Sequence, residues 1–163
     1  MSNVKLLYGR GELSVDLPET SDVTLIRKPS MPRLADPSLA VESTLSNPTA
    51  SAVLKNHTKN AKTACILICD ITRPVPNSLI LRPIIRKLMT LGIQLEQITI
   101  LIATGLHRPN EGKELEELIG DPWVLENAKV ENHFARDDSA HIEVGTTKKG
   151  NRILLDRRFV IAD

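Results

Sequence analysis

Two segments in the middle of the chain, ILICDITRPVP (66–76) and ITILIATGLHRP (98–109), constrain its fold most strongly. Each begins with an apolar, β-branched run, which is typical of a strand covered on both faces. Each run stops abruptly at polar residues and a proline, and a helical pattern follows. This order of elements predicts right-handed βαβ units and a mainly parallel sheet. We therefore expect an α/β fold with Rossmann-like βαβ units.

Two helices are predicted around these strands. The apolar residues of 84–89 form one stripe that ends near Gly92, and Pro83 is expected to begin that helix or to kink it. Asn110 is expected to cap the next helix, which ends at Gly120.

The N-terminal region reads as short strands. The segments VKLLYG (4–9) and ELSVDL (12–17) flank Arg10 and Gly11, which predicts a β-hairpin. Residues 22–29 predict a third extended segment that stops at a proline.

The remaining segments complete one domain. Asp36 is a plausible N-cap with Pro37 at the first helical position, and a second short helix is expected over 50–56. Short C-terminal strands are expected in 129–134, 141–145 and 152–161. We predict a single α/β domain over 1–163, with no internal repeat.

Composition excludes several classes of function. The net charge of +1 is spread along the chain, and aromatic residues make up only 2%, so neither the basic surface nor the stacking platforms of nucleic-acid binding are present. No run has membrane-spanning length, and the first residues lack the apolar stretch of a signal peptide. Cys65 and Cys69 lie in one expected strand, too far apart for a disulfide, which predicts buried, reduced thiols in a cytoplasmic protein.

Polar side chains follow both central strands, where α/β proteins bind ligands. Asp70 could orient a base, a substrate or the nearby arginine, or it could cap a turn. Arg73 precedes Pro74 on a stiff loop and could hold a carboxylate or phosphate, or lie in solvent. The hydroxyl of Thr72 could serve the turn or a ligand.

His107 is the sharpest single candidate. It follows Thr104 and Gly105, a flexible pair that would let the backbone approach a ligand closely. Imidazole suits proton transfer near neutral pH, although a hydrogen-bonded structural histidine is the alternative.

Other chemistry is less well supported. His57, His133 and His141 lack the close spacing of a local zinc site, so no metal site is assigned within this chain. The basic residues of 148–152 read as a solvated hairpin rather than an anion site.

These motifs resemble the N-terminal part of the nickel-dependent lactate racemase family. The DxTRP and ATGxHRP pair is specific, and further matching segments extend the resemblance over nearly the whole chain. The matching segments are YGRGELSVDLP (8–18), DITRPVP (70–76), ATGLHRP (103–109), EELIG (116–120), ENH (131–133) and VGTTKKG (144–150).

The resemblance implies a racemase or epimerase of 2-hydroxy acids. Members of this family use a nickel-pincer nucleotide, made from nicotinic acid, that takes a hydride from the substrate's α-carbon and returns it to the other face. A base accepts the hydroxyl proton as the hydride leaves, and a second base acts from the opposite side.

By motif, the resemblance gives His107 the role of one of these bases. The substrate carboxylate and its pocket would be held by Arg73, Asp70 and Thr72. The wall of the cofactor or substrate site would be shaped by Thr104, Gly105 and Arg108.

The resemblance also implies that part of the machinery lies elsewhere. The family's second catalytic histidine, the lysine that attaches the cofactor and the nickel-binding histidine come further along than Asp163. We therefore expect 1–163 to be the N-terminal part of a longer two-domain enzyme, inactive and without cofactor on its own. Its expected partners are the 2-hydroxy acid and the C-terminal region, and an uncovered apolar face predicts self-association.

Two alternatives stay open. One is a non-catalytic module that binds a hydroxy acid or a nucleotide in the same crevice. The other is a different α/β enzyme that uses His107 as a base without a metal.

Overall fold

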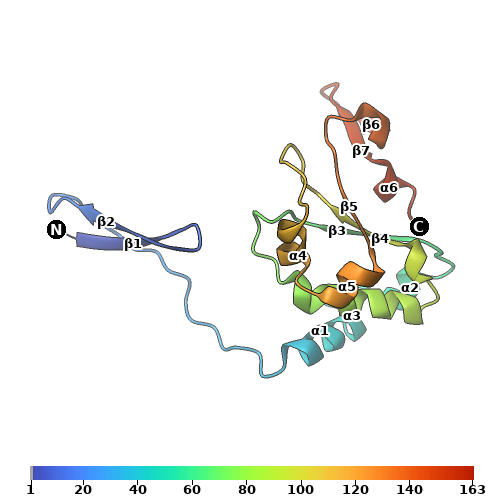
Figure 1. The fold of residues 1–163 in the computed structure, drawn as a ribbon, viewed down its shortest axis with the longest axis horizontal. Helices are drawn as coiled ribbons and strands as arrows, with labels where there is room; N and C mark the ends of the chain where they lie inside the picture. The colour runs from blue at the N-terminus through green and yellow to red at the C-terminus, as the bar shows by residue number, and fades with distance from the viewer. Residues whose placement is uncertain (1) are drawn as a thin grey trace. The chain divides into compact units, whose positions relative to one another are not determined.

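A three-stranded parallel sheet forms the centre of the fold. The computed structural model describes residues 2–163 (Figure 1) and pairs β3 (Ala64–Ile68), β4 (Ile98–Ile102) and β5 (Lys129–Asn132) in the order β3-β4-β5. In register, Ile68 lies opposite Ile102, which in turn lies opposite Asn132, so the three strands end at one edge. The predicted α/β fold with parallel βαβ units is confirmed.

Helices connect these strands and cover the sheet. The connection from β3 to β4 contains α3 (Asn77–Thr90) and the short 3-10 turn η1 (Leu95–Gln97). The connection from β4 to β5 contains α4 (Lys113–Ile119) and α5 (Pro122–Asn127). Two earlier helices are α1 (Pro37–Ser46), which packs on α3, and α2 (Leu54–His57).

The core between sheet and helices is aliphatic, as the scarcity of aromatic residues requires. Its buried members come from β3, β4, the helices α3, α4 and α5, and the turn after α3. They are Ile68, Leu81, Ile85, Leu88, Ile93, Ile98, Ile100, Ile102, Leu118, Ile119 and Val124. Burial of such side chains is the main favourable contribution to folding, so this cluster fixes the sheet edge that carries the polar residues.

Two helices begin at other residues than predicted. Helix α3 begins at Asn77, so Pro83 lies inside it and does not begin it. The Asn77 side chain donates a hydrogen bond to the Leu118 carbonyl (3.0 Å), which ties the start of α3 to α4. Helix α2 starts at Leu54, later than expected, because Ala50 has a left-handed backbone (φ +50°).

Helix caps account for the predicted α1 and for the unpredicted α5. The Asp36 carboxylate accepts a hydrogen bond from the Leu39 backbone N–H (2.9 Å), which confirms the expected cap. Asp121 followed by Pro122 caps α5 in the same way. The same sequence signal, an aspartate followed by a proline, therefore begins both helices.

The chain divides into two compact units, one ending at Arg33 and one spanning Leu34–Asp163. The first unit contains the predicted hairpin, β1 (Ser2–Tyr8) and β2 (Gly11–Leu17), which is antiparallel with Tyr8 opposite Gly11. The third extended segment, 22–29, forms no strand, because no neighbouring strand pairs with it. That 1–163 is one domain of a longer two-domain enzyme stays a prediction.

The C-terminal residues form a hairpin and a helical turn. Strands β6 (His141–Thr146) and β7 (Arg152–Asp156) are antiparallel and follow the short 3-10 turn η2 (Asp138–Ala140). The expectation of one extended piece over 152–161 is wrong, since α6 (Arg157–Val160) begins directly after Asp156. The Asp156 carboxylate accepts a hydrogen bond from the Arg158 N–H (2.9 Å), and this cap stops the strand.

Coverage of the sheet is unequal. Strand β4 is buried except at Thr99, which is partly buried, but in β3 Leu67 is 47% exposed. Cys69 is exposed and Cys65 is only partly buried, so the expectation of two buried thiols is wrong. Strand β3 lies at the edge of the sheet and pairs with β4 alone.

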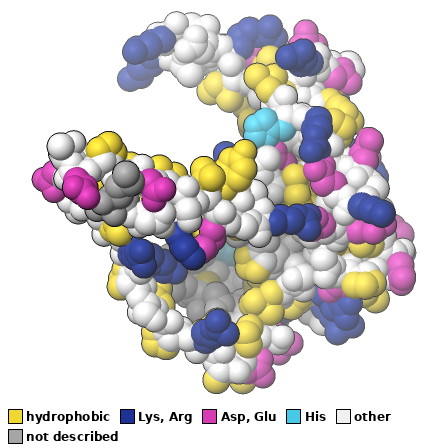
Figure 2. All heavy atoms as spheres, turned by 60° about the vertical axis from the view of Figure 1, so that its left-hand side comes forward, with side chains coloured by type: hydrophobic (Ala, Val, Ile, Leu, Met, Phe, Trp, Pro, Cys, Tyr) yellow, Lys and Arg dark blue, Asp and Glu magenta, His cyan; other side chains and the backbone are white. Residues whose placement is uncertain are grey.

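The surface carries charges of both signs between scattered apolar side chains (Figure 2). Leu106 and Ile161 are among the exposed apolar residues, and association of copies through such residues stays a prediction. None of the helices formed by residues 2–163 has the length and apolar character needed to cross a membrane.

Candidate functional site

A crevice of about 260 Å³ lies beyond the carboxyl ends of β3 and β4, where the sequence predicted a site. The two turns that follow these strands form its walls. The lining residues are Asp70, Ile71, Thr72, His107, Arg108 and Asn110. Three of the residues proposed for substrate binding and catalysis, Asp70, Thr72 and His107, are thereby brought together.

The turn after β3 is organised around Asp70, whose side chain is buried (6% exposed). One carboxylate oxygen, Oδ1, accepts hydrogen bonds from the Thr72 backbone N–H (3.1 Å) and the Thr72 hydroxyl (2.5 Å). The Asp70 carbonyl accepts another from the Arg73 N–H (3.1 Å). Thr72 therefore serves the turn, and it does so by holding the carboxylate in one orientation.

The second carboxylate oxygen of Asp70, Oδ2, is hydrogen-bonded to Nδ1 of His107. His107 lies on the turn after β4, where its N–H donates to the Thr104 carbonyl (3.0 Å) and Gly105 adopts a left-handed backbone (φ +58°). The imidazole is 55% exposed, so its other edge is accessible from the crevice. A buried carboxylate and an accessible histidine thus form a pair.

The protonation of this pair follows from its hydrogen bonds. The Thr72 hydroxyl lowers the pKa of Asp70, and the hydrogen bond from His107 lowers it further against the opposing effect of burial. Asp70 is therefore ionised at neutral pH and can only accept hydrogen bonds, so Nδ1 of His107 must carry the proton. In the neutral imidazole, Nε2 then presents a lone pair, which is the arrangement of a general base.

Arg108 and Glu114 form a second charged pair at the crevice. The guanidinium donates to both carboxylate oxygens, with 2.6 Å between Nη2 and Oε1. This bidentate hydrogen bond raises the pKa of Arg108 and lowers that of Glu114. The donors of Arg108 that face Glu114 are therefore occupied.

The other three predicted residues, Arg73, Thr104 and Gly105, differ in which of their groups remain available to a ligand. Arg73 is exposed, and within the described part of the chain its guanidinium joins no hydrogen bond or ion pair. Thr104 is buried, and its hydroxyl donates to the His133 carbonyl, which links the ends of β4 and β5. At Gly105 no atom lies within 4 Å of where a Cβ would be, so its backbone faces open space.

Asn110 was predicted as a helix cap, and that prediction is wrong. Helix α4 begins after Gly112, and its N-terminus has no side-chain cap. The Asn110 amide instead accepts a hydrogen bond from the Ile71 N–H (3.2 Å) and donates one to Glu114 (3.0 Å). Its backbone exchanges two hydrogen bonds with the side chain of Asn132. Helical spacing predicts a cap at this position, but it carries no information about contacts with residues far away in the sequence.

A second histidine–carboxylate pair lies beside the same sheet. Nδ1 of His133 is 2.9 Å from Oδ2 of Asp156, and the same oxygen accepts a hydrogen bond from Arg158 (2.6 Å). Burial raises the pKa of Asp156, but the hydrogen bonds from Arg158 and His133 outweigh it and hold that pKa far below its usual range. Arg158 also donates to the Asn132 carbonyl (3.0 Å), so the cluster joins β5, β7 and α6.

Metal-binding side chains do not gather in the described chain. No group of three or more His, Cys, Asp or Glu residues in 2–163 is arranged to hold a metal ion. His133 and His141 do approach each other, with ring centroids 5.0 Å apart and the rings edge to face.

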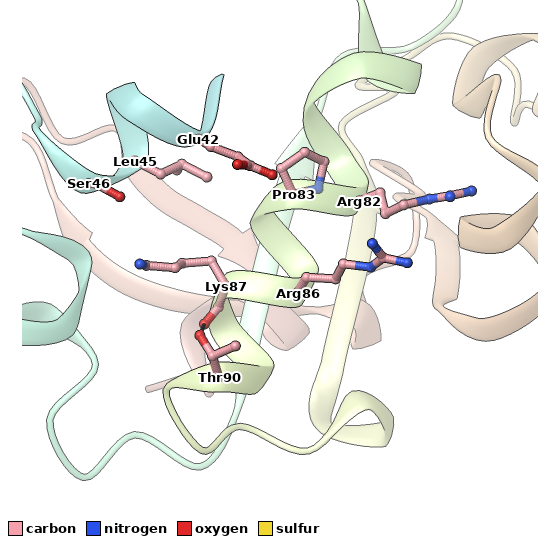
Figure 3. A pocket seen from close by; sticks show the side chains of 8 residues that line it. All are labelled: Glu42, Leu45, Ser46, Arg82, Pro83, Arg86, Lys87 and Thr90. Carbon is pink, nitrogen blue, oxygen red and sulfur yellow. Dashed lines mark hydrogen bonds between the residues drawn. The ribbon is translucent and has the colours of Figure 1, made fainter. Parts of the chain in front are cut away.

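A separate pocket of about 300 Å³ lies between α1 and α3 (Figure 3). Its three basic residues do not converge, because Lys87 points to the α1 side while Arg82 and Arg86 point the other way. Arg82 pairs with Asp121, and the Arg86 guanidinium lies 5.4 Å from the centroid of the Trp123 ring. This pocket is therefore not built to hold an anion.

Comparisons with known proteins give a consistent result. Residues 8–163 match the family described as lactate racemase N-terminal domain. A lactate racemase from Lactiplantibacillus plantarum is 31% identical over 123 residues, which cover 76% of this chain and 28% of the relative. A lactate racemase from Thermoanaerobacterium thermosaccharolyticum is 28% identical over all of this chain and 38% of the relative. The chain thus spans about a third of the length of these curated relatives.

Solved structures agree with the fold. The lactate racemase apoprotein from Thermoanaerobacterium thermosaccharolyticum matches 99% of this chain and 37% of its own length, with a TM-score of 0.73 and 27% identity. A protein from Thermotoga maritima, 21% identical with a TM-score of 0.56, shares the fold over 74% of this chain. Since the family match spans the strand-end turns and the crevice between them, the chain belongs to the lactate racemase N-terminal domain family.

Proposed function

We propose that this chain is the N-terminal, substrate- and cofactor-binding part of a lactate racemase-like 2-hydroxy acid racemase or epimerase. We further propose that the complete protein works by hydride transfer to a nickel-pincer nucleotide. The observation that carries the proposal is the Asp70–His107 pair at the carboxyl ends of two parallel strands. Family membership and the lactate racemase relatives support the substrate class.

In the proposed reaction, Arg73 binds the substrate carboxylate. Its exposed guanidinium has two parallel N–H groups that match a carboxylate, and Arg73 closes the turn that Asp70 begins. The substrate hydroxyl then lies toward His107. Removal of the α-hydrogen with its electron pair turns the C–O bond into a carbonyl, so the hydroxyl proton must leave in the same step.

His107 accepts that proton at Nε2, the nitrogen that Asp70 leaves free. The resulting imidazolium is stabilised by the buried Asp70 carboxylate, which stays ionised. In the reverse direction the same nitrogen returns the proton to the oxygen as the hydride comes back to the carbon. Asp70 and Thr72 thereby support the base rather than contact the reacting atoms.

The described residues do not fit a nickel site, since no suitable cluster of ligands occurs in 2–163. We therefore assign no step on the metal to this chain. Gly105 is the residue best suited to a cofactor or substrate wall, because its backbone is open on the side where a Cβ would be. Contributions from Thr104 and Arg108 stay proposals, and their bonds to His133 and Glu114 make them supports of that wall.

Racemisation of α-deuterated lactate by the full-length protein that carries this chain tests the proposal. Hydride transfer and return predicts racemised product that keeps its deuterium in ordinary water. Removal of the α-hydrogen as a proton would exchange the deuterium with solvent and would contradict the hydride route. Binding of a 2-hydroxy acid without any racemisation would favour the non-catalytic binding module instead.

A further inference from the structure

Asn110 lies between the two turns that carry the proposed base and its carboxylate. It is almost fully buried (1% exposed) and comes three residues after His107. Its side-chain oxygen accepts a hydrogen bond from the N–H of Ile71, the residue next to Asp70 (3.2 Å). This bond joins the turn after β3 to the turn after β4.

The remaining hydrogen-bonding groups of Asn110 attach it to two further segments. Its backbone N–H donates to the Asn132 side chain (2.9 Å), and its carbonyl accepts from the same amide (3.0 Å). Asn132 ends β5, so all three parallel strands are linked through one residue. The Asn110 amide also donates to Glu114 (3.0 Å), which holds Arg108.

Both turns are internally stiff, so their docking decides how the pair meets. Asp70 is held to Thr72 through two hydrogen bonds, and His107 is held to Thr104 through its backbone N–H. These hydrogen bonds hold each turn together as a unit. The bond from Asn110 to Ile71 is a direct polar link between these two units.

We propose that Asn110 is a positioning residue that aligns His107 with Asp70 and, through Glu114, fixes Arg108 at the same crevice. Its polar groups are taken up by protein partners, so it acts through other residues rather than on a ligand. The inference rests on the proposed role of His107 as a base. It adds a specific cause for the geometry of that base, which the predicted role as a helix cap does not supply.

NMR of the 163-residue chain tests this alignment without any assay of turnover. Correlations from carbon-bound ring protons to both imidazole nitrogens report which nitrogen carries the proton. In the wild type, His107 is expected to be mainly the Nδ1–H tautomer when neutral. In Asn110→Ala, the turns lose their link and this preference is expected to be lost. Retention of the preference in a folded Asn110→Ala variant would overturn the proposal.

The Asn110→Asp variant separates the two links and covers the case in which Asn110→Ala does not fold. Its carboxylate can still accept from Ile71, so the His107 tautomer should be retained. It cannot donate to Glu114, whose pKa is lowered first by Arg108 and next by Asn110, so the pKa of Glu114 should rise. An unchanged Glu114 titration would contradict the proposed link to Arg108.

Asn127→Ala is the matched control, because this exposed asparagine donates only to a carbonyl on its own helix (2.8 Å). It should leave the His107 tautomer and the Glu114 titration unchanged, and a change in either would overturn the assignment to Asn110. Neither readout depends on racemase activity. If the full-length protein fails to racemise while both readouts behave as expected, the proposed function fails and the alignment stands.

Discussion

His107 and Asp70 are hydrogen-bonded through Nδ1 and Oδ2 although 37 positions separate them in the sequence. Asp70 begins the turn after β3 and His107 ends the turn after β4, and the in-register pairing of Ile68 with Ile102 places the two turns side by side. The buried carboxylate fixes the tautomer of the exposed imidazole. The catalytic proposal therefore depends on a contact that the sheet creates.

Replacing His107 by Gln in the full-length protein should lower the rate of racemisation. Loss of a general base costs about 10²- to 10⁴-fold in rate, and we expect kcat to fall by an amount in that range. Asp70→Asn should also lower kcat, because an amide can donate to Nδ1 and would then favour the wrong tautomer. Chiral chromatography of the product measures both rates.

The matched control for these variants is His57→Gln. His57 is exposed on α2 and makes only a long contact with Ser51 (3.4 Å). Its replacement should leave kcat unchanged. Turnover of His107→Gln at the wild-type rate, with the fold retained, would remove His107 from the mechanism.

Arg73→Lys should weaken substrate binding more than it slows the chemical step. A lysine keeps the charge but loses the two parallel donors that match a carboxylate. Hydrogen bonds to charged groups contribute about 1.5–3 kcal/mol, so we expect KM to rise by about 10- to 100-fold. Arg136→Lys, at another exposed arginine, should leave KM unchanged. A KM that does not respond to Arg73→Lys would place the carboxylate elsewhere.

The sheet and its site edge were predictable because two strong local signals agree. A buried apolar run followed by polar turn residues marks both β3 and β4, and the helical stripe between them leaves few topologies. The segment 22–29 shows the limit of this reasoning, since an extended pattern does not specify a partner strand. The end of β7 shows another, since Asp156 serves at once as a helix cap and as a partner of His133.

Only the site residues that directly follow the strands were predictable from the sequence. Asp70, Thr72 and His107 follow the ends of strands, and that position alone predicts that they line a ligand site. Asn110 bonds across 39 positions to Ile71 and across 22 positions to Asn132, and no local pattern encodes such distances. The supports of a site depend on which segments meet, and that information comes from the packed fold.

Acid should destabilise the protein partly through Asp156. Because the folded pKa of this carboxyl lies far below the ordinary 3.8, its contribution to stability is complete at neutral pH. The contribution is then lost as the pH falls below the ordinary value toward the folded one. Asp156→Asn should therefore lower the free energy of unfolding at neutral pH by about 1.5–3 kcal/mol and by less at about pH 3. Urea unfolding at both pH values measures the difference.

Glu126→Gln is the control for this experiment, since Glu126 is exposed at the end of α5. It should change the stability little at either pH. Equal destabilisation by Asp156→Asn at neutral and acid pH would mean that the ionised carboxylate is not what holds β7 and α6 to β5.

Gly105 and Gly120 should respond differently to alanine. Both have a left-handed backbone, so each substitution carries a strain of about 1–2 kcal/mol. A Cβ at Gly105 meets no atom within 4 Å, whereas at Gly120 it would lie 3.0 Å from Cβ of Ser78. We therefore expect Gly120→Ala to lower the free energy of unfolding more than Gly105→Ala does, as measured by urea titration. The reverse order would mean that a Cβ at Gly105 does meet neighbouring atoms.

The two thiols should react at different rates with a thiol reagent such as DTNB. Burial raises the pKa of Cys65, and the nearby Asp156 carboxylate raises it further, so little thiolate forms there. Cys69 is exposed beside the Asp70 turn and should react first. In the native chain we expect a fast phase that Cys69→Ser removes and a slow phase that Cys65→Ser removes. A fast phase that survives Cys69→Ser would mean that the open face of β3 admits the reagent to Cys65 as well.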